Sequence, residues 1–154
     1  MPDKELTYKN HLSLFEDCPK EDCIERNLPA FRWVHSDATY KDFLPLSLHP
    51  ETPLRQLDDS DQMCLSYGLS MFNSADAARR RYLEIYNKRT REFQKQKFKN
   101  EKGDKIAYIQ ITKDDGLSSD SNSIGHFTFY EYKGSNIWEK IQDLLDIFAD
   151  NGKA

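Results

Sequence analysis

Hydrophobic and polar positions alternate with the period of a β-strand near the start of the chain. In residues 30 to 36 (AFRWVHS), Phe31 and Trp33 share one face, and Arg32 and Val34 share the other. Successive side chains of a strand point to opposite faces, so this alternation predicts a first strand.

Three further stretches have strand character. Residues 105 to 112 (KIAYIQIT) are rich in β-branched side chains, and residues 125 to 132 (GHFTFYEY) alternate aromatic with polar positions. Residues 63 to 72 (MCLSYGLSMF) are apolar enough for a buried strand, in which Gly68 marks a bulge or the close approach of another backbone. Together with the first strand, they predict a sheet of about four or more strands.

Helical spacing occurs in two places. From a cap at Asn73 or Ser74, residues recur at spacings of three and four as far as about Lys95: Ala75, Ala78, Tyr82, Ile85, Arg89 and Phe93. At the C-terminal end, Asn136 and Glu139 form a plausible capping box. The helix that follows would bury Ile137, Ile141, Leu144, Leu145 and Phe148. We therefore predict a long helix at 74–98 and a C-terminal amphipathic helix.

The remaining segments connect these elements. Residues 1–29 are expected to form an arm or a short helix packed on the domain. Residues 37–62 contain three prolines and an acidic run, which predicts an irregular connection, and residues 114–125 read as a loop. The predicted fold is one α+β domain over 1–154, with a mixed or mainly antiparallel sheet on which the long basic helix and the C-terminal helix pack.

Composition narrows the class of protein. The 154 residues suit one domain, and 38% hydrophobic against 31% charged residues indicate a globular chain. No apolar run could span a bilayer, and the start of the chain lacks the features of a signal peptide. We therefore expect a cytoplasmic protein with no membrane partner, which could form a homodimer.

Cysteine and histidine spacing predicts no metal site. Cys18 and Cys23 have no second pair to complete a zinc site, so the three cysteines are expected to be reduced. His35 and His126 are interpreted as strand-edge residues. The loop at 114–125 does not match the spacing of a calcium-binding EF-hand, and no cofactor-binding motif is present.

Charge is distributed unevenly along the chain. Residues 79 to 102 hold ten Lys or Arg and three Glu, whereas the other 130 residues have a net charge of −11. The predicted binding residues are Arg79, Arg80, Arg81, Tyr82, Lys88, Arg89, Arg91, Lys95 and Lys97. Basic and aromatic side chains together suit contact with phosphates and bases, which indicates nucleic acid or an acidic protein as the partner. The alternatives are a solvated helix and a contact with the acidic loop of a second subunit.

Three residues form a candidate catalytic set. If the strands are neighbours, Arg32, Ser70 and Glu131 would line one cleft, and a carboxylate in an aromatic strand is costly to bury without a partner. The arrangement is similar to the layout of the ADP-ribosyltransferase superfamily, in which the Glu orients the nicotinamide ribose. It departs from that pattern at GLS, where a Ser-Thr-Ser run is usual, and at Phe129, where a second carboxylate is usual. The alternative is a structural Arg–Glu pair.

Three functions follow from these features. The leading one is a small interaction protein that engages an anionic partner through its basic helix. The first alternative is a transferase-like enzyme that acts on a nucleotide-derived substrate, and the second is an accessory subunit of a larger assembly.

Overall fold

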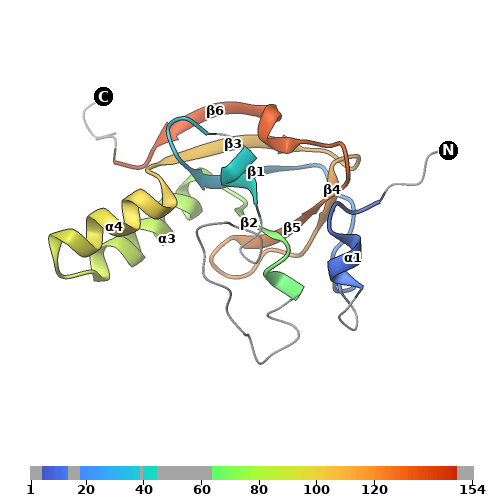
Figure 1. The fold of residues 1–154 in the computed structure, drawn as a ribbon, viewed down its shortest axis with the longest axis horizontal. Coiled ribbons are helices and arrows are strands. Elements are labelled where there is room, and N and C mark those ends of the chain that lie inside the picture. Colours follow the sequence, from blue (N-terminus) through green and yellow to red (C-terminus); the bar gives the residue numbers. More distant parts are fainter. Residues whose placement is uncertain (1–4, 14–17, 39, 45–63, 149–154) are drawn as a thin grey trace.

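A six-stranded sheet dominates the structure, a computed structural model that describes residues 5–13, 18–38, 40–44 and 64–148 (Figure 1). The strands are β1 (Leu28–Val34), β2 (Leu69–Phe72), β3 (Lys105–Ile111), β4 (Gly116–Ser118), β5 (His126–Glu131) and β6 (Ile141–Asp146). Their order is β4-β5-β2-β1-β3-β6, and every neighbouring pair is antiparallel. The predicted α+β class is confirmed.

Helices complete the described part of the fold. They are the α-helices α1 (Lys9–Leu12), α3 (Ala75–Lys88) and α4 (Glu92–Lys102) and the 3₁₀ helices η1 (Tyr40–Phe43) and η3 (Ile137–Lys140). Figure 1 shows α3 and α4 side by side as a hairpin that extends away from the sheet.

The strand predictions agree with the sheet except at two places. Residues 105–112 and 125–132 contain β3 and β5, and residues 30–36 overlap β1, which begins two residues earlier at Leu28. Only Leu69–Phe72 of the fourth stretch is a strand. The place of a Cβ atom at Gly68 is already taken by the side chain of Thr128, so the close approach there involves a side chain and not a backbone. The stretch at 114–125, expected to be a loop, contains β4, which pairs with the outer side of β5.

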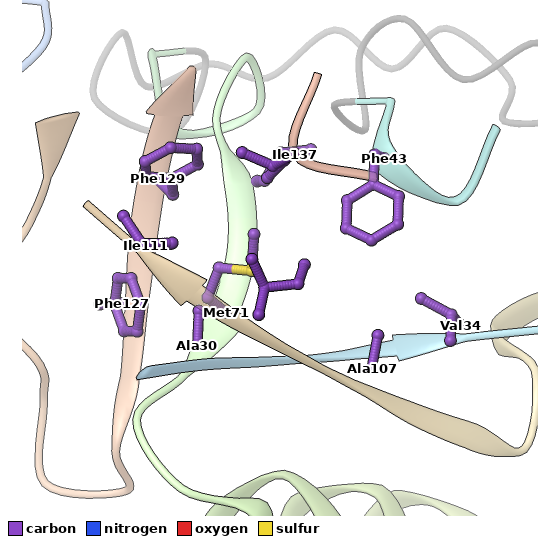
Figure 2. Packing of buried hydrophobic residues seen from close by; sticks show 11 residues of the cluster. Ala30, Val34, Phe43, Met71, Ala107, Ile111, Phe127, Phe129 and Ile137 are labelled. Atoms are coloured by element: carbon purple, nitrogen blue, oxygen red, sulfur yellow. The ribbon is translucent and has the colours of Figure 1, made fainter. Parts of the chain in front are cut away.

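The sheet is joined at its middle by one residue pair. β1 pairs with β3 along its whole length and β2 pairs with β5 along four residues, but β1 meets β2 only at Phe31 and Phe72. Figure 2 shows the strands that carry Ala30 and Met71 running in clearly different directions. The sheet is therefore two halves bent about one junction.

The hydrophobic core fills the inside of this bend. It consists of Ala30, Val34, Phe43, Leu69, Met71, Ala107, Ile109, Ile111, Phe127, Phe129 and Ile137 (Figure 2). Phe43 comes from η1 and Ile137 from η3, so both 3₁₀ helices cover this face of the sheet. Alternate residues of β1 contribute to it, as the period of two requires.

The second face of the sheet packs on α3 and α4 through aromatic rings. Trp33 of β1 stacks on Phe72 with ring centres 5.6 Å apart and meets the edges of Tyr82 and Phe98 at 5.3 and 6.1 Å. Its indole N–H donates to the backbone oxygen of Ala78, 2.9 Å away. Trp33 thus connects the sheet to both helices.

The prediction of one long helix over residues 74–98 is wrong. α3 ends at Lys88, and α4 begins at Glu92 and runs back toward the sheet. A continuous helix would carry Phe98 away from the sheet, whereas the reversal buries Phe98 against Trp33 and Tyr82. Burying a phenylalanine side chain stabilises the fold by about 1.5–3 kcal/mol. Helix propensity at the few exposed residues between α3 and α4 contributes less than this, so the interrupted helix is the more stable arrangement.

The predicted C-terminal amphipathic helix is also wrong. Its first turn is the 3₁₀ helix η3, and the rest is strand β6, paired with β3. Residues four apart, such as Ile137 and Ile141, share a face in a helix and also in a strand, so their spacing does not separate the two structures. β6 supplies hydrogen bonds to the free edge of β3, which an amphipathic helix cannot do.

The N-terminal segment and the segment before β2 are joined covalently. Cys18 and Cys64 form a disulfide, so the expectation of reduced thiols is wrong for these two, and Cys23 remains free. Cys64 is buried with Leu12 of α1 and Tyr130 of β5. The disulfide therefore lies inside a small third cluster of buried side chains.

Candidate functional site

The helical hairpin carries most of the positive charge of the chain. The inner sides of α3 and α4 pack on the sheet, while their connection lies at the end far from it (Figure 1). The eight charged residues of the predicted binding set fall into three groups, which differ in what their charged ends contact.

The first group is engaged with oxygen atoms of the protein. Arg79 donates to the backbone oxygen of Asp146 at 2.8 Å, and Arg80 and Arg81 pair with Asp76 and Glu84 at 2.9 and 3.5 Å. Exposed pairs of this kind contribute about 0–1 kcal/mol to folding. A polyanion can replace the partners of Arg80 and Arg81 at low cost.

The second group lies over aromatic rings. Arg89 lies over Phe98 and Lys95 over Tyr86, at 5.1 and 5.4 Å from the ring centres. Lys99 lies over Phe148 at 4.8 Å. Such contacts cover the ring faces with the stems of the side chains and leave the charge near the surface.

The third group forms what we call the hairpin tip: Lys88, Arg91, Phe93 and Lys97. Its three cations are exposed, and within the described residues none of them has an ion pair. Phe93 is 64% exposed, and Lys97 lies one turn further along the same face of α4. Among the described residues, the tip therefore presents an exposed aromatic ring in a segment whose three cations make no ion pair.

Tyr82, the one aromatic residue among the predicted binding residues, is in the core. It is fully buried, and its hydroxyl donates to the backbone oxygen of Gly103 at 2.6 Å. It holds the end of α4 against α3 and presents no ring to solvent. Phe93, which the helical spacing assigned to the apolar stripe, is instead exposed on α4.

Arg32 occupies the gap where β1 and β2 diverge. Its Nε donates to the backbone oxygen of Asp42 at 2.7 Å, and its Nη1 donates to the backbone oxygen of Ser70 at 2.8 Å. The guanidinium also lies 5.6 Å from the centre of the Phe43 ring. Burial lowers its pKa to about 10 although Asp42 raises it, so Arg32 remains charged at neutral pH. Its side chain thus supplies a hydrogen bond between β1 and β2 where the two strands are not paired through their backbones.

Ser70 contacts a histidine that the sequence had not linked to it. The exposed Ser70 Oγ is hydrogen-bonded to Nε2 of His126. The register pairs Phe72 with His126 and Ser70 with Thr128, which puts all four side chains on one face. Pairing the predicted strands at 63–72 and 125–132 in this register would have revealed the contact.

The charge state of His126 follows from its surroundings. Burial lowers the pKa of the imidazole, and the positive charges of Arg32 and Arg81 lower it further. His126 is therefore neutral at pH 7, with one ring nitrogen able to accept a proton.

Glu131 is engaged at the other end of β5. Its Oε2 accepts a hydrogen bond from the backbone N–H of Ile137 at 2.8 Å, at the start of η3. Burial raises the pKa of Glu131, and Asp115 raises it further against the opposing effect of the Ile137 amide. Glu131 thus caps a short helix.

Two of the three candidate catalytic residues are neighbours. Arg32 contacts the backbone of Ser70. On β5, Ser70 is paired with Thr128, and Glu131 lies three residues further along the strand, roughly 10 Å from Thr128. By strand parity, Ser70 faces the helices whereas Glu131 lies on the side of Phe127 and Phe129. The hydrogen bonds described here join Ser70 to His126 and not to Glu131.

Asp115, in the predicted loop at 114–125, is buried and has hydrogen-bond partners within the protein. It is 1% exposed and accepts hydrogen bonds from Thr112 N, Thr112 Oγ1 and Ser135 Oγ at 2.8, 3.1 and 2.8 Å, and from Lys140 Nζ. These donors use the oxygens that a cation would need. Within the described residues, no group of three or more acidic, histidine or cysteine side chains could hold a metal ion.

Comparison of the chain with protein-family models, with curated proteins and with solved structures finds no match. Among the described helices, none combines the length and apolar composition needed to cross a bilayer.

Proposed function

We propose that the protein binds single-stranded nucleic acid through the hairpin tip. The observation that carries the proposal is Phe93, which is 64% exposed and lies among three cations without ion pairs in the described part of the chain. A polyanion suits these charges, and an unpaired base suits the ring because every base has a face that can stack. An acidic protein would satisfy the charges but does not require an exposed aromatic ring.

The neighbouring groups support the same function. Arg80 and Arg81 have only exposed partners, and Lys95 and Lys99 keep their charges near the surface, so a strand crossing the hairpin would meet further cations. The rest of the chain is acidic and repels a polyanion. Binding is thereby confined to the hairpin.

The test is binding of a fluorescently labelled 12-nucleotide oligothymidine, followed by anisotropy at several salt concentrations. Contact with about four phosphates predicts a slope near −3 in a plot of log K against log salt. Phe93→Ala should weaken binding by about 1–3 kcal/mol, the value of one stacked base. Arg91→Glu should weaken it and make the slope shallower, whereas Lys113→Glu, an exposed charge reversal outside the hairpin, should leave it nearly unchanged.

Two results would contradict the proposal. One is wild-type affinity that does not depend on salt, and the other is equal affinity of wild type and Phe93→Ala. If no oligonucleotide binds and an acidic protein does so through the same lysines and arginines, the protein-partner function takes its place.

A transferase-like activity is the second candidate, and the contact between Arg32 and Ser70 favours it. The resemblance to ADP-ribosyltransferases implies NAD as the substrate. In that case Glu131→Gln should abolish release of nicotinamide while the melting temperature changes little. Absence of NAD turnover by the wild-type protein rejects this candidate.

A further inference from the structure

Ser70 and His126 form a second chemically competent arrangement, separate from the hairpin tip. The Ser70 side chain is exposed on β2, and its Oγ lies within hydrogen-bonding distance of His126 Nε2 on β5. Both residues belong to strands whose register is fixed by four consecutive pairs. Groups held on paired strands keep their relative position better than groups on loops.

The chemistry of the pair is that of a nucleophile and its base. A serine hydroxyl is a weak nucleophile until an adjacent group takes its proton, and a neutral imidazole can do so. Burial and two nearby guanidiniums keep the pKa of His126 below its usual value, so the ring is uncharged at neutral pH. With the ring proton on Nδ1, Nε2 is free to accept the proton of Ser70.

One positive charge lies on the same side of the sheet as the pair. Arg81 lies on α3, close enough to lower the pKa of His126, whereas Arg32 reaches only the backbone oxygen of Ser70 from the opposite face. A cation next to a reacting carbonyl stabilises the negative charge that develops on its oxygen, and it also attracts anionic substrates.

From this geometry we propose that Ser70 is a nucleophile activated by His126, and that the pair hydrolyses esters that carry a carboxylate near the reacting carbonyl. This activity does not depend on nucleic-acid binding at the hairpin tip.

The proposed reaction needs no partner other than water. Ser70 Oγ attacks the carbonyl carbon while His126 Nε2 takes the hydroxyl proton. The bond to the leaving oxygen then breaks, His126 returns the proton to that oxygen, and an acyl-serine remains. A water molecule, deprotonated by His126, attacks the acyl-serine, which releases the carboxylic acid and restores Ser70.

The first test is covalent labelling with a fluorophosphonate probe, with the modified residue located by mass spectrometry. Wild type should be labelled at Ser70, and Ser70→Ala should lose the label. His126→Gln should slow labelling about 100-fold, the lower range for loss of a general base. Ser36→Ala removes an exposed serine elsewhere and serves as the matched control.

The second test compares 4-nitrophenyl hemisuccinate, which carries a carboxylate, with neutral 4-nitrophenyl acetate. Wild type should have the higher kcat/KM for the hemisuccinate, and Arg81→Gln should reduce this preference severalfold.

Ser70 is exposed, so Ser70→Ala keeps the fold and remains decisive even if His126→Gln unfolds. Two results would overturn the assignment of Ser70 as the nucleophile. One is labelling of wild type at another residue, and the other is equal rates of hydrolysis by wild type and Ser70→Ala. Equal rates for the two esters would overturn the proposed preference for substrates that carry a carboxylate.

Discussion

The imidazole of His35, at the end of β1, is bound to the carboxylate of Asp42 in η1, with Nδ1 and Oδ1 2.6 Å apart. Its other nitrogen lies 2.7 Å from the backbone oxygen of Asn100 in α4. A ring that faces two acceptors is best satisfied when both nitrogens carry protons. His35 therefore links the sheet, η1 and the helical hairpin most strongly in its charged form.

This link predicts that stability depends on pH. Burial lowers the pKa of His35, but the acceptors Asn100 and Asp42 outweigh burial, so the folded-state pKa is raised above the usual value near 6.5. The stabilisation is complete below the unfolded-state pKa and is lost as pH rises through the folded-state pKa. In urea unfolding, the free energy of unfolding of wild type should exceed that of His35→Gln by a larger amount at pH 5.5 than at pH 8.5. A difference that is constant with pH, or grows with it, would show that His35 is not held as the cation.

The reversal of the chain between α3 and α4 predicts opposite effects for two phenylalanines. Phe98 is buried against Trp33, so Phe98→Ala should destabilise the protein by about 3–5 kcal/mol. Phe93 is 64% exposed, and Phe93→Ala should change stability by less than about 0.5 kcal/mol. Chemical unfolding of both variants measures the contrast. Similar losses at the two positions would mean that α4 does not fold back as described.

The start of α3 predicts a difference between two neighbouring residues. Ser74 Oγ accepts a hydrogen bond from the backbone N–H of Ala77 at 3.0 Å, so Ser74→Ala should cost about 1 kcal/mol. Asn73 precedes the cap and is exposed, so Asn73→Ala serves as the control, with an expected change below about 0.5 kcal/mol. Thermal melts of the two variants make the comparison, and a larger loss for Asn73→Ala would place the cap one residue earlier.

The capping role of Glu131 predicts how two substitutions rank. Glu131→Ala leaves the buried backbone N–H of Ile137 without an acceptor, which should cost about 1–3 kcal/mol. Glu131→Gln keeps an oxygen in the same place and should retain most of the stability. Differential scanning calorimetry of both proteins provides the measurement. Equal losses would indicate that the charge of Glu131, and not its hydrogen bond, supports the fold.

The disulfide predicts the number of free thiols. Denatured protein that has not been reduced should react with one equivalent of a thiol reagent, at Cys23, and reduced protein with three. The bond closes a loop with a sequence separation of 46 residues, so Cys18→Ser should cost about 2–4 kcal/mol under oxidising conditions. Disulfides are rare in the cytosol, so three free thiols in freshly isolated protein would agree with the predicted cytoplasmic location and contradict the bond.

The sequence alone determined the approximate positions of β1, β3 and β5, a helix cap at Asn73 or Ser74, and the concentration of positive charge in residues 79–102. These features depend on residues close together in the chain, because alternation and capping are local properties. The sequence also placed Arg32 and Ser70 within strands, but it could not show that Arg32 contacts the backbone of Ser70.

Only the tertiary structure decided where α3 ends, that residues 141–146 form a strand, and that His126 is the partner of Ser70. In each case distant residues compete with local preference. Phe98 is buried only if the chain reverses, the edge of β3 is satisfied only by a strand, and Ser70 meets His126 only through one register of β2 with β5. Local pattern cannot choose among these arrangements, because the free energy that selects them comes from burial and hydrogen bonds between segments far apart in the sequence.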